Sequence, residues 1–118
     1  IADGNFPAES MGKDAIVIRM DGHGTCELLR AILQVFPLDT YVEHPVRLMQ
    51  VMPGDPVETP IWKSYEEIVT DTGSAKRDAI GYLERFSFYD EAKTAYAIIA
   101  TGETALYANI MLQKGVVT

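Results

Sequence analysis

Hydrophobic and polar residues alternate along the chain with two different periods. Residues 14–19 form a short β-branched run between glycine-containing segments, which predicts a strand buried on both of its faces. Apolar residues between Leu28 and Phe36 instead recur at the helical period and predict an amphipathic helix. We expect Thr25 to cap this helix and Pro37 to end it. A strand followed by a helix is typical of α/β proteins.

The same alternation continues through the rest of the chain. A strand over 46–52 is followed by the turn 53–56, which is rich in proline and glycine. A second helix begins at Pro60, with Thr59 as its cap, and ends at Gly73. The remaining elements are a strand over 82–86, a helix over 87–95 in which Ser87 and Asp90 have capping-box spacing, and strands over 96–100 and 109–112.

Strands that alternate with helices indicate an α/β fold, because crossover helices are the usual connection between parallel strands. We expect one compact layered domain over residues 1–118, with a mixed or mostly parallel sheet flanked by helices. A length of 118 residues suits a single core. Hydrophobic residues make up 47% and charged residues 23% of the chain, which excludes a disordered or low-complexity protein.

The net charge, the apolar runs and the single cysteine indicate which binding partners and which cellular compartment to expect. The formal net charge of −7 repels phosphate backbones, so nucleic acid is not an expected partner. The apolar runs, such as 95–100, are far shorter than the roughly 20 residues of a membrane-spanning helix, so no membrane partner is expected. Cys26 is the only cysteine, which excludes an internal disulfide and a multi-cysteine zinc site. A single thiol fits the reducing cytoplasm, where we expect the protein to be.

Familiar catalytic patterns are weak in this chain. His23 and His44 lack the paired spacing of a metal site, so we interpret both as loop histidines and predict no metal. The serines lack a glycine-flanked elbow, and Cys26 is more simply a small core side chain. The glycines of 21–24 do not complete a dinucleotide-binding fingerprint.

Three clusters of polar and aromatic residues carry more information: 2–7, 85–90 and 101–109. The first follows the end of an apparent strand, where ligands of α/β sheets bind. In the second, Arg85 stands beside three aromatic residues, which suits a hydroxylated ring because guanidinium donors reach its oxygens and aromatic faces cover its C–H surface. No cluster has the several cations that a phosphate needs, so an uncharged polyol is the favoured ligand.

Several runs, in order along nearly the whole chain, resemble the ribose and fucose mutarotase family. They are residues 3–7 (Asp-Gly-Asn-Phe-Pro), 36–42 (Phe-Pro-Leu-Asp-Thr-Tyr-Val), 84–89 (Glu-Arg-Phe-Ser-Phe-Tyr), 100–103 (Ala-Thr-Gly-Glu), 107–110 (Tyr-Ala-Asn-Ile) and 114–116 (Lys-Gly-Val).

The resemblance implies an isomerase that interconverts the α and β anomers of a free monosaccharide without a cofactor. The substrate-binding positions of the family fall on Asp3, Arg85, Tyr107, Ala108 and Asn109. The residues around Arg85 are of the fucose type, whereas Ala108 replaces a glycine and resembles the ribose branch. We expect L-fucose as the substrate, with D-ribose mutarotation or pyranase activity as the alternative. From a different class, a non-catalytic sugar-binding accessory protein remains an alternative.

One family motif has no counterpart in this sequence. Family members carry Gly-His-Gly-Asp just upstream of the position of Asp3, and its histidine is the proposed proton donor. His23 and His44 do not match it, so no catalytic residue is assigned. We expect the domain to lack its N-terminal segment and this chain to have little activity. Since family members form decameric rings, the resemblance also implies a homo-oligomer.

Overall fold

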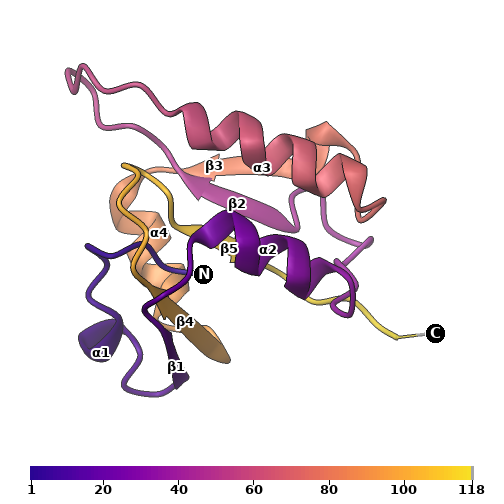
Figure 1. Cartoon of the computed structure of the whole chain (residues 1–118), viewed down its shortest axis with the longest axis horizontal. Coiled ribbons are helices and arrows are strands. Elements are labelled where there is room, and N and C mark those ends of the chain that lie inside the picture. Colours follow the sequence, from indigo (N-terminus) through magenta and orange to yellow (C-terminus); the bar gives the residue numbers. More distant parts are fainter. Residues whose placement is uncertain (118) are drawn as a thin grey trace.

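Helices and strands alternate along residues 1–117, which the computed structural model describes (Figure 1). The elements in chain order are α1 (Ala8–Met11), β1 (Ile16–Met20), α2 (Thr25–Leu33), β2 (Val46–Met49), α3 (Pro60–Asp71), the 3-10 helix η1 (Arg77–Ala79), β3 (Ile80–Leu83), α4 (Arg85–Ala92), β4 (Ala97–Thr101) and β5 (Ile110–Leu112). None of the helices within this part of the chain has the length and apolar character that crossing a bilayer requires.

The strands form two sheets. In the first, β1 runs parallel to β4, with Ile18 opposite Ile99. In the second, β2 lies between β3, to which it is parallel, and β5, to which it is antiparallel. The predicted α/β fold with a mixed sheet flanked by helices is therefore confirmed, with its strands divided over two sheets.

Helices cover both faces of the second sheet. Figure 1 shows α2 and α3 side by side along one face of it, where Leu29 and Tyr65 pack with Leu48 in the main core. The side chain of Arg47, next to Leu48 on β2, alternates to the other face and lies 3.5 Å from the Glu91 carboxylate of α4. Leu29, Leu48 and Tyr65 are fully buried. Burial of such side chains is worth about 2 kcal/mol each, so this core supplies much of the stability.

Several predicted boundaries move when the structure is compared with the sequence pattern. Pro60 is the first residue of α3 as predicted, but the side chain of Thr59 makes no capping hydrogen bond. The predicted strand 82–86 is wrong at its end, because Arg85 already begins α4. The predicted cap Ser87 is also wrong: the carboxylate of Glu84 accepts the backbone N–H groups of Phe86 and Ser87 instead.

The prediction that the first strand is buried on both faces is wrong for this chain. Ile16 is 50% exposed and Ile18 is 43% exposed. The physical reason is the small size of the first sheet, in which β1 is an edge strand next to β4 only. A β-branched run therefore does not distinguish a strand covered within its own chain from one that leaves an apolar face open.

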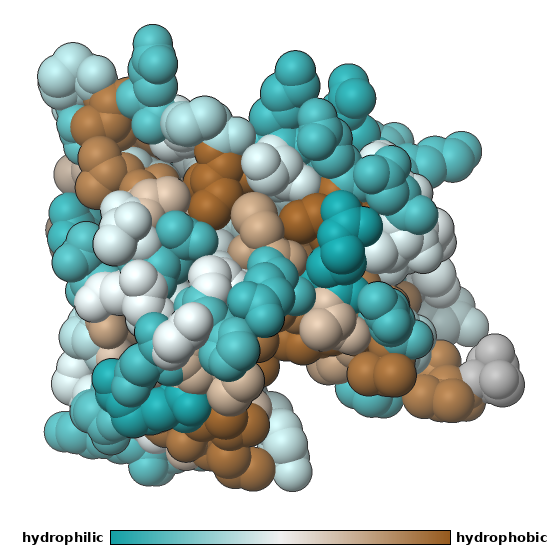
Figure 2. Space-filling model, viewed as in Figure 1, coloured by the Kyte–Doolittle hydropathy of each residue, from teal (hydrophilic) through white to brown (hydrophobic). Residues whose placement is uncertain are grey.

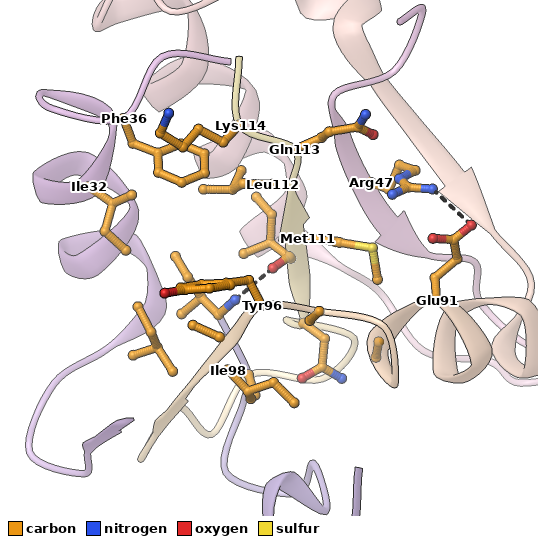
Figure 3. A pocket seen from close by; sticks show the side chains of 18 of the residues that line it. Ile32, Phe36, Arg47, Glu91, Tyr96, Ile98, Met111, Leu112, Gln113 and Lys114 are labelled. Carbon is orange, nitrogen blue, oxygen red and sulfur yellow. Dashed lines mark hydrogen bonds and ion pairs between the residues drawn. The ribbon is translucent and has the colours of Figure 1, made fainter. Parts of the chain in front are cut away.

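A deep hollow separates the two sheets. Ile1 exchanges two backbone hydrogen bonds with Ile110 of β5, while Ala2 forms a parallel bridge with Ala100 of β4. Beyond Ile1, β4 and β5 separate, and a cavity of about 810 Å³ lies between them. Figure 2 shows the notch in the surface edged by hydrophobic residues, and Figure 3 shows side chains of β4 and β5, among them Ile98 and Leu112, lining it.

Helix α2 is capped by a residue far away in the sequence. The predicted cap Thr25 is instead the first helical residue, after Gly24, and Oε1 of Glu103 accepts its N–H at 3.1 Å and its hydroxyl at 3.0 Å. Burial of Glu103 opposes its ionisation, but hydrogen bonds from Thr25, Thr104 and Ala105 outweigh it and hold the pKa below the ordinary value of 4.5. An ionised carboxylate at the N-terminus of a helix is favourable.

This geometry predicts that Glu103 stabilises the fold only while it is ionised. Because its folded pKa is below the unfolded one, its contribution is complete above pH 4.5 and is lost as the pH falls through the folded pKa. Glu103→Gln should lower the free energy of unfolding at pH 7 by about 1 kcal/mol, with a deficit that shrinks toward pH 3. Urea unfolding across this range measures it, with the exposed Glu58→Gln as the control. A deficit independent of pH would contradict the prediction.

Candidate functional site

Asp3 and Asn109, which are 106 residues apart in the sequence, lie side by side. The backbone N–H of Asp3 donates to Oδ1 of Asn109 at 2.8 Å, and each residue is only 7% exposed. The fold explains the meeting, because Ala2 is bridged to β4 and Ile1 is paired with Ile110. The structure therefore brings together two of the site residues that the sequence predicted at opposite ends of the chain.

The carboxyl group of Asp3 is partly withdrawn from water. Burial raises its pKa, while backbone N–H groups of Asn5, Ala108 and Phe6 oppose that rise and the nearby Glu103 charge adds to it. Oδ1 of Asp3 accepts the Asn5 N–H at 3.1 Å. The net effect is a pKa above its ordinary value. A carboxyl group whose pKa is moved toward neutrality is better able to exchange a proton with a bound hydroxyl.

Tyr107 lies in the loop before β5 and has a left-handed backbone conformation, with φ of 53°. Its hydroxyl donates to Oδ2 of Asp55 at 2.8 Å and accepts the N–H of Met52 at 3.3 Å. Ala108 is fully buried, and its neighbour Asn109 holds Asp3. The segment 107–109 is therefore fixed at both of its ends.

Arg85 reaches this region only through aromatic side chains. It is exposed at the first position of α4, with its guanidinium carbon 5.7 Å from the centre of the Tyr89 ring. The ring of Tyr89 in turn lies 5.8 Å from that of Phe6, which follows Asp3 in the N-terminal loop. Within residues 1–117 Arg85 makes no hydrogen bond or ion pair with Asp3, so these contacts connect it to the candidate site without joining it to the polar cluster.

Glu103 belongs to the predicted cluster 101–109, but the sequence predicted no role for it, and Thr25 was predicted only as a helix cap. Glu103 adds a negative charge that acts on Asp3, and its partner Thr25 lies 2.6 Å from the hydroxyl of Tyr65. A carboxylate that caps a helix from another loop leaves no local spacing signal. Only the tertiary structure could have revealed this pair.

The other titratable candidates lie elsewhere. Nδ1 of His23 is 2.9 Å from Oε1 of Glu27 at the exposed start of α2, and Nδ1 of His44 is 3.2 Å from the carbonyl oxygen of Asp78. Cys26 is half-buried, and burial raises its thiol pKa. In the described part of the chain no group of three or more histidine, cysteine or acidic side chains is arranged to hold a metal ion.

The large hollow between the sheets borders the polar cluster at Asn109 but is lined mostly by other residues. Of the five predicted site residues only Asn109 lines it. Side chains such as Phe36, Tyr96 and Leu112, labelled in Figure 3, make most of its wall apolar. A sugar needs convergent hydrogen-bonding groups, so the cluster of Asp3 and Asn109 is the better candidate for a polyol site.

Comparisons with known proteins show what the whole chain is similar to. The model of the RbsD / FucU transport protein family matches residues 1–117. The fucose mutarotase of Homo sapiens is 48% identical over 120 residues, which cover 98% of this chain and 77% of that protein. FucU from Bifidobacterium longum, a crystal structure, has a TM-score of 0.96 and 63% identity over 100% of this chain and 82% of that one.

A second solved structure is the fucose mutarotase from Streptococcus pneumoniae in complex with L-fucose. Its TM-score is 0.92, with 45% identity over 99% of this chain and 81% of that chain. The resemblance found in the sequence is thereby confirmed, and the chain belongs to the RbsD / FucU family.

Proposed function

We propose that this protein interconverts the α and β anomers of free L-fucose. The observation that carries the proposal is its likeness, over nearly its whole length, to a fucose mutarotase solved with L-fucose. The buried carboxyl and amide groups of Asp3 and Asn109 supply the kind of polar site that an uncharged sugar requires. D-ribose is the less favoured substrate, because curated relatives with 40–48% identity are named fucose mutarotases.

Mutarotation requires two proton transfers and no redox change. The anomeric hydroxyl loses its proton as its oxygen becomes a carbonyl oxygen, the bond between C1 and the ring oxygen breaks, and the ring oxygen takes up a proton. The open aldehyde rotates, and the reverse steps close the ring on its other face. Since the reaction already proceeds in water, general acid–base catalysis and positioning are sufficient, and we propose no cofactor.

Each predicted site residue has a role in this proposal. Asp3, with its raised pKa, accepts hydrogen bonds from sugar hydroxyls. Tyr107 and Asn109 bind the anomeric region, and the backbone N–H of Ala108 holds the carboxylate of Asp3 beside them. Arg85 orients the ring, because its guanidinium has several donors on a long exposed side chain.

We also propose that an N-terminal segment preceding Ile1 completes the sheet and carries the principal proton donor. The support is the geometry of the hollow: Ile1 and Ala2 hydrogen-bond to both neighbouring strands, and the facing edges of β4 and β5 continue along it. An extended segment of alternating apolar residues could pair with both edges at once. The three relatives described above are also longer than this chain.

A homo-oligomer, decameric as in the family, is proposed for the assembly. Its support is the open apolar surface of the chain, where Ile16 and Ile18 of β1 and the 84% exposed Tyr96 next to β4 are uncovered. Light scattering should give a mass several times 13.1 kDa, and a monomer would contradict this proposal. The cytoplasmic location stays a prediction that rests on Cys26 alone.

Anomer exchange measured by saturation-transfer NMR tests the activity. A protein extended upstream of Ile1 should exchange L-fucose anomers faster than buffer, and its Arg85→Ala variant should be at least about tenfold slower, since a charged donor is lost. The 118-residue chain should remain near the buffer rate. Saturable binding without exchange by the extended protein would favour the accessory-protein alternative. An Arg85→Ala variant as fast as wild type would remove Arg85 from the site.

Sugar affinity tests the role of Asp3 separately from catalysis. Asp3→Asn keeps the shape of the side chain but removes its charge, so the dissociation constant for L-fucose should rise by about tenfold. NMR titration of the 118-residue chain measures it, with D-ribose compared side by side. Asp14→Asn, an exposed change before β1, should leave the affinity unchanged. Equal affinities of wild type and Asp3→Asn would remove Asp3 from the site.

A further inference from the structure

Two consecutive carbonyl groups of the site loop are held by one helix. The indole N–H of Trp62 donates to the carbonyl oxygen of Tyr107 at 2.8 Å, and the hydroxyl of Tyr65 lies 2.6 Å from the carbonyl oxygen of Ala108. Trp62 and Tyr65 are three positions apart on α3 and therefore share a face of that helix. One face of α3 thus fixes the direction of two successive peptide groups.

The backbone at this point needs such support. Tyr107 is the only described residue other than glycine with a positive φ, and a left-handed conformation costs a residue with a Cβ about 1–2 kcal/mol. Conformations of this kind persist where surrounding contacts over-determine them. Because Asn109 follows two residues later, a rotation at Tyr107 would also move the side chain that contacts Asp3.

The hydroxyl of Tyr65 has a second hydrogen-bond partner. This hydroxyl, on a fully buried ring, lies 2.6 Å from Oγ1 of Thr25, and the Thr25 hydroxyl donates to Glu103. Because Thr25 donates its proton to Glu103, the single proton of Tyr65 is shared between Oγ1 of Thr25 and the carbonyl oxygen of Ala108, each 2.6 Å away. Burial raises the pKa of Tyr65, which keeps the phenol neutral and able to donate.

We propose that Trp62 and Tyr65 are positioning residues of the sugar site, which set the backbone of 107–109 so that Tyr107 and Asn109 face the sugar. This inference rests on the function proposed above. Neither residue needs to touch the substrate, since both bond to the loop through its carbonyl oxygens. Their loss should therefore act on sugar affinity through the loop alone.

Substitutions that remove one hydrogen-bond donor each test the proposal. Tyr65→Phe removes only the hydroxyl, and Trp62→Phe removes the indole donor at a position that is half-buried and therefore tolerant if the first variant folds poorly. Each should raise the dissociation constant for L-fucose about fivefold or more, as expected for the loss of one hydrogen bond of about 1 kcal/mol. The matched control Tyr41→Phe, on an 88% exposed side chain, should bind like wild type.

Two further measurements separate positioning from a general loss of stability. Without sugar, hydrogen exchange at the Ala108 and Asn109 amides should accelerate in both variants more than exchange at Leu29 or Leu48 in the core. In double variants, the effect of Tyr65→Phe on affinity should shrink below about twofold beside Asn109→Ala but remain complete beside Arg85→Ala. A merely structural role would give equal effects in both backgrounds.

The outcomes also distinguish this proposal from the one it rests on. If wild type does not bind L-fucose, the proposed function fails, and unchanged exchange at Ala108 and Asn109 would additionally overturn the role of α3. If wild type binds and both variants bind equally well, the positioning role is wrong while the function stands. Unequal effects of Asn109→Ala and Arg85→Ala on the Tyr65 variant support it.

Discussion

The backbone hydrogen bonds of Ile1 and Ala2 are the constraint on which the candidate site depends. These residues join β5 on one side and β4 on the other, so they connect the two sheets. Asp3 comes next in the chain and therefore lies beside the loop that precedes β5, where Oδ1 of Asn109 accepts its backbone N–H. A carboxylate and an amide from opposite ends of the sequence meet because Ile1, two residues before Asp3, pairs with β5, and Ala2 pairs with β4.

Two carboxylates near this point have opposite properties, and the difference follows from their surroundings. Glu103 is partly exposed and receives hydrogen bonds from two chain segments, so it remains ionised and serves the structure. Asp3 is more deeply buried and also faces the charge of Glu103, so its proton is held more firmly. A fixed charge beside a more weakly acidic group is an arrangement by which environments push the pKa values of paired groups apart.

The sequence was informative where a local rule decides the structure. The proline at position 60 could begin a helix, and the period between Leu28 and Phe36 could be satisfied only by a helix, although α2 ends earlier, at Leu33. It was uninformative where a hydrogen-bond partner comes from a distant segment or where a side chain caps the following helix. No spacing rule shows that Glu103 caps α2, or that Glu84 caps α4, which begins at Arg85.

The predicted site residues were found by motif resemblance, and only part of their geometry could be anticipated. The sequence predicted a strand end before Asp3, where the structure has a single bridge between Ala2 and Ala100, and the contact of Asp3 with Asn109 depends on the sheet topology. The contribution of Trp62 and Tyr65 was not predictable, because on the sequence they are two aromatic residues of an amphipathic helix. The exposure of Ile16 was missed because hydrophobic runs do not reveal how many neighbours a strand has.

The complete burial of Ala108 has a consequence for how related proteins select among sugars. Its methyl group has no accessible surface, its N–H is directed to Asp3 and its carbonyl oxygen to Tyr65. An exchange of alanine for glycine here removes no atom that a bound molecule could contact. Any direct contact that discriminates between a deoxyhexose and a pentose therefore comes from other residues, and a change at this position can act only through the backbone of the loop.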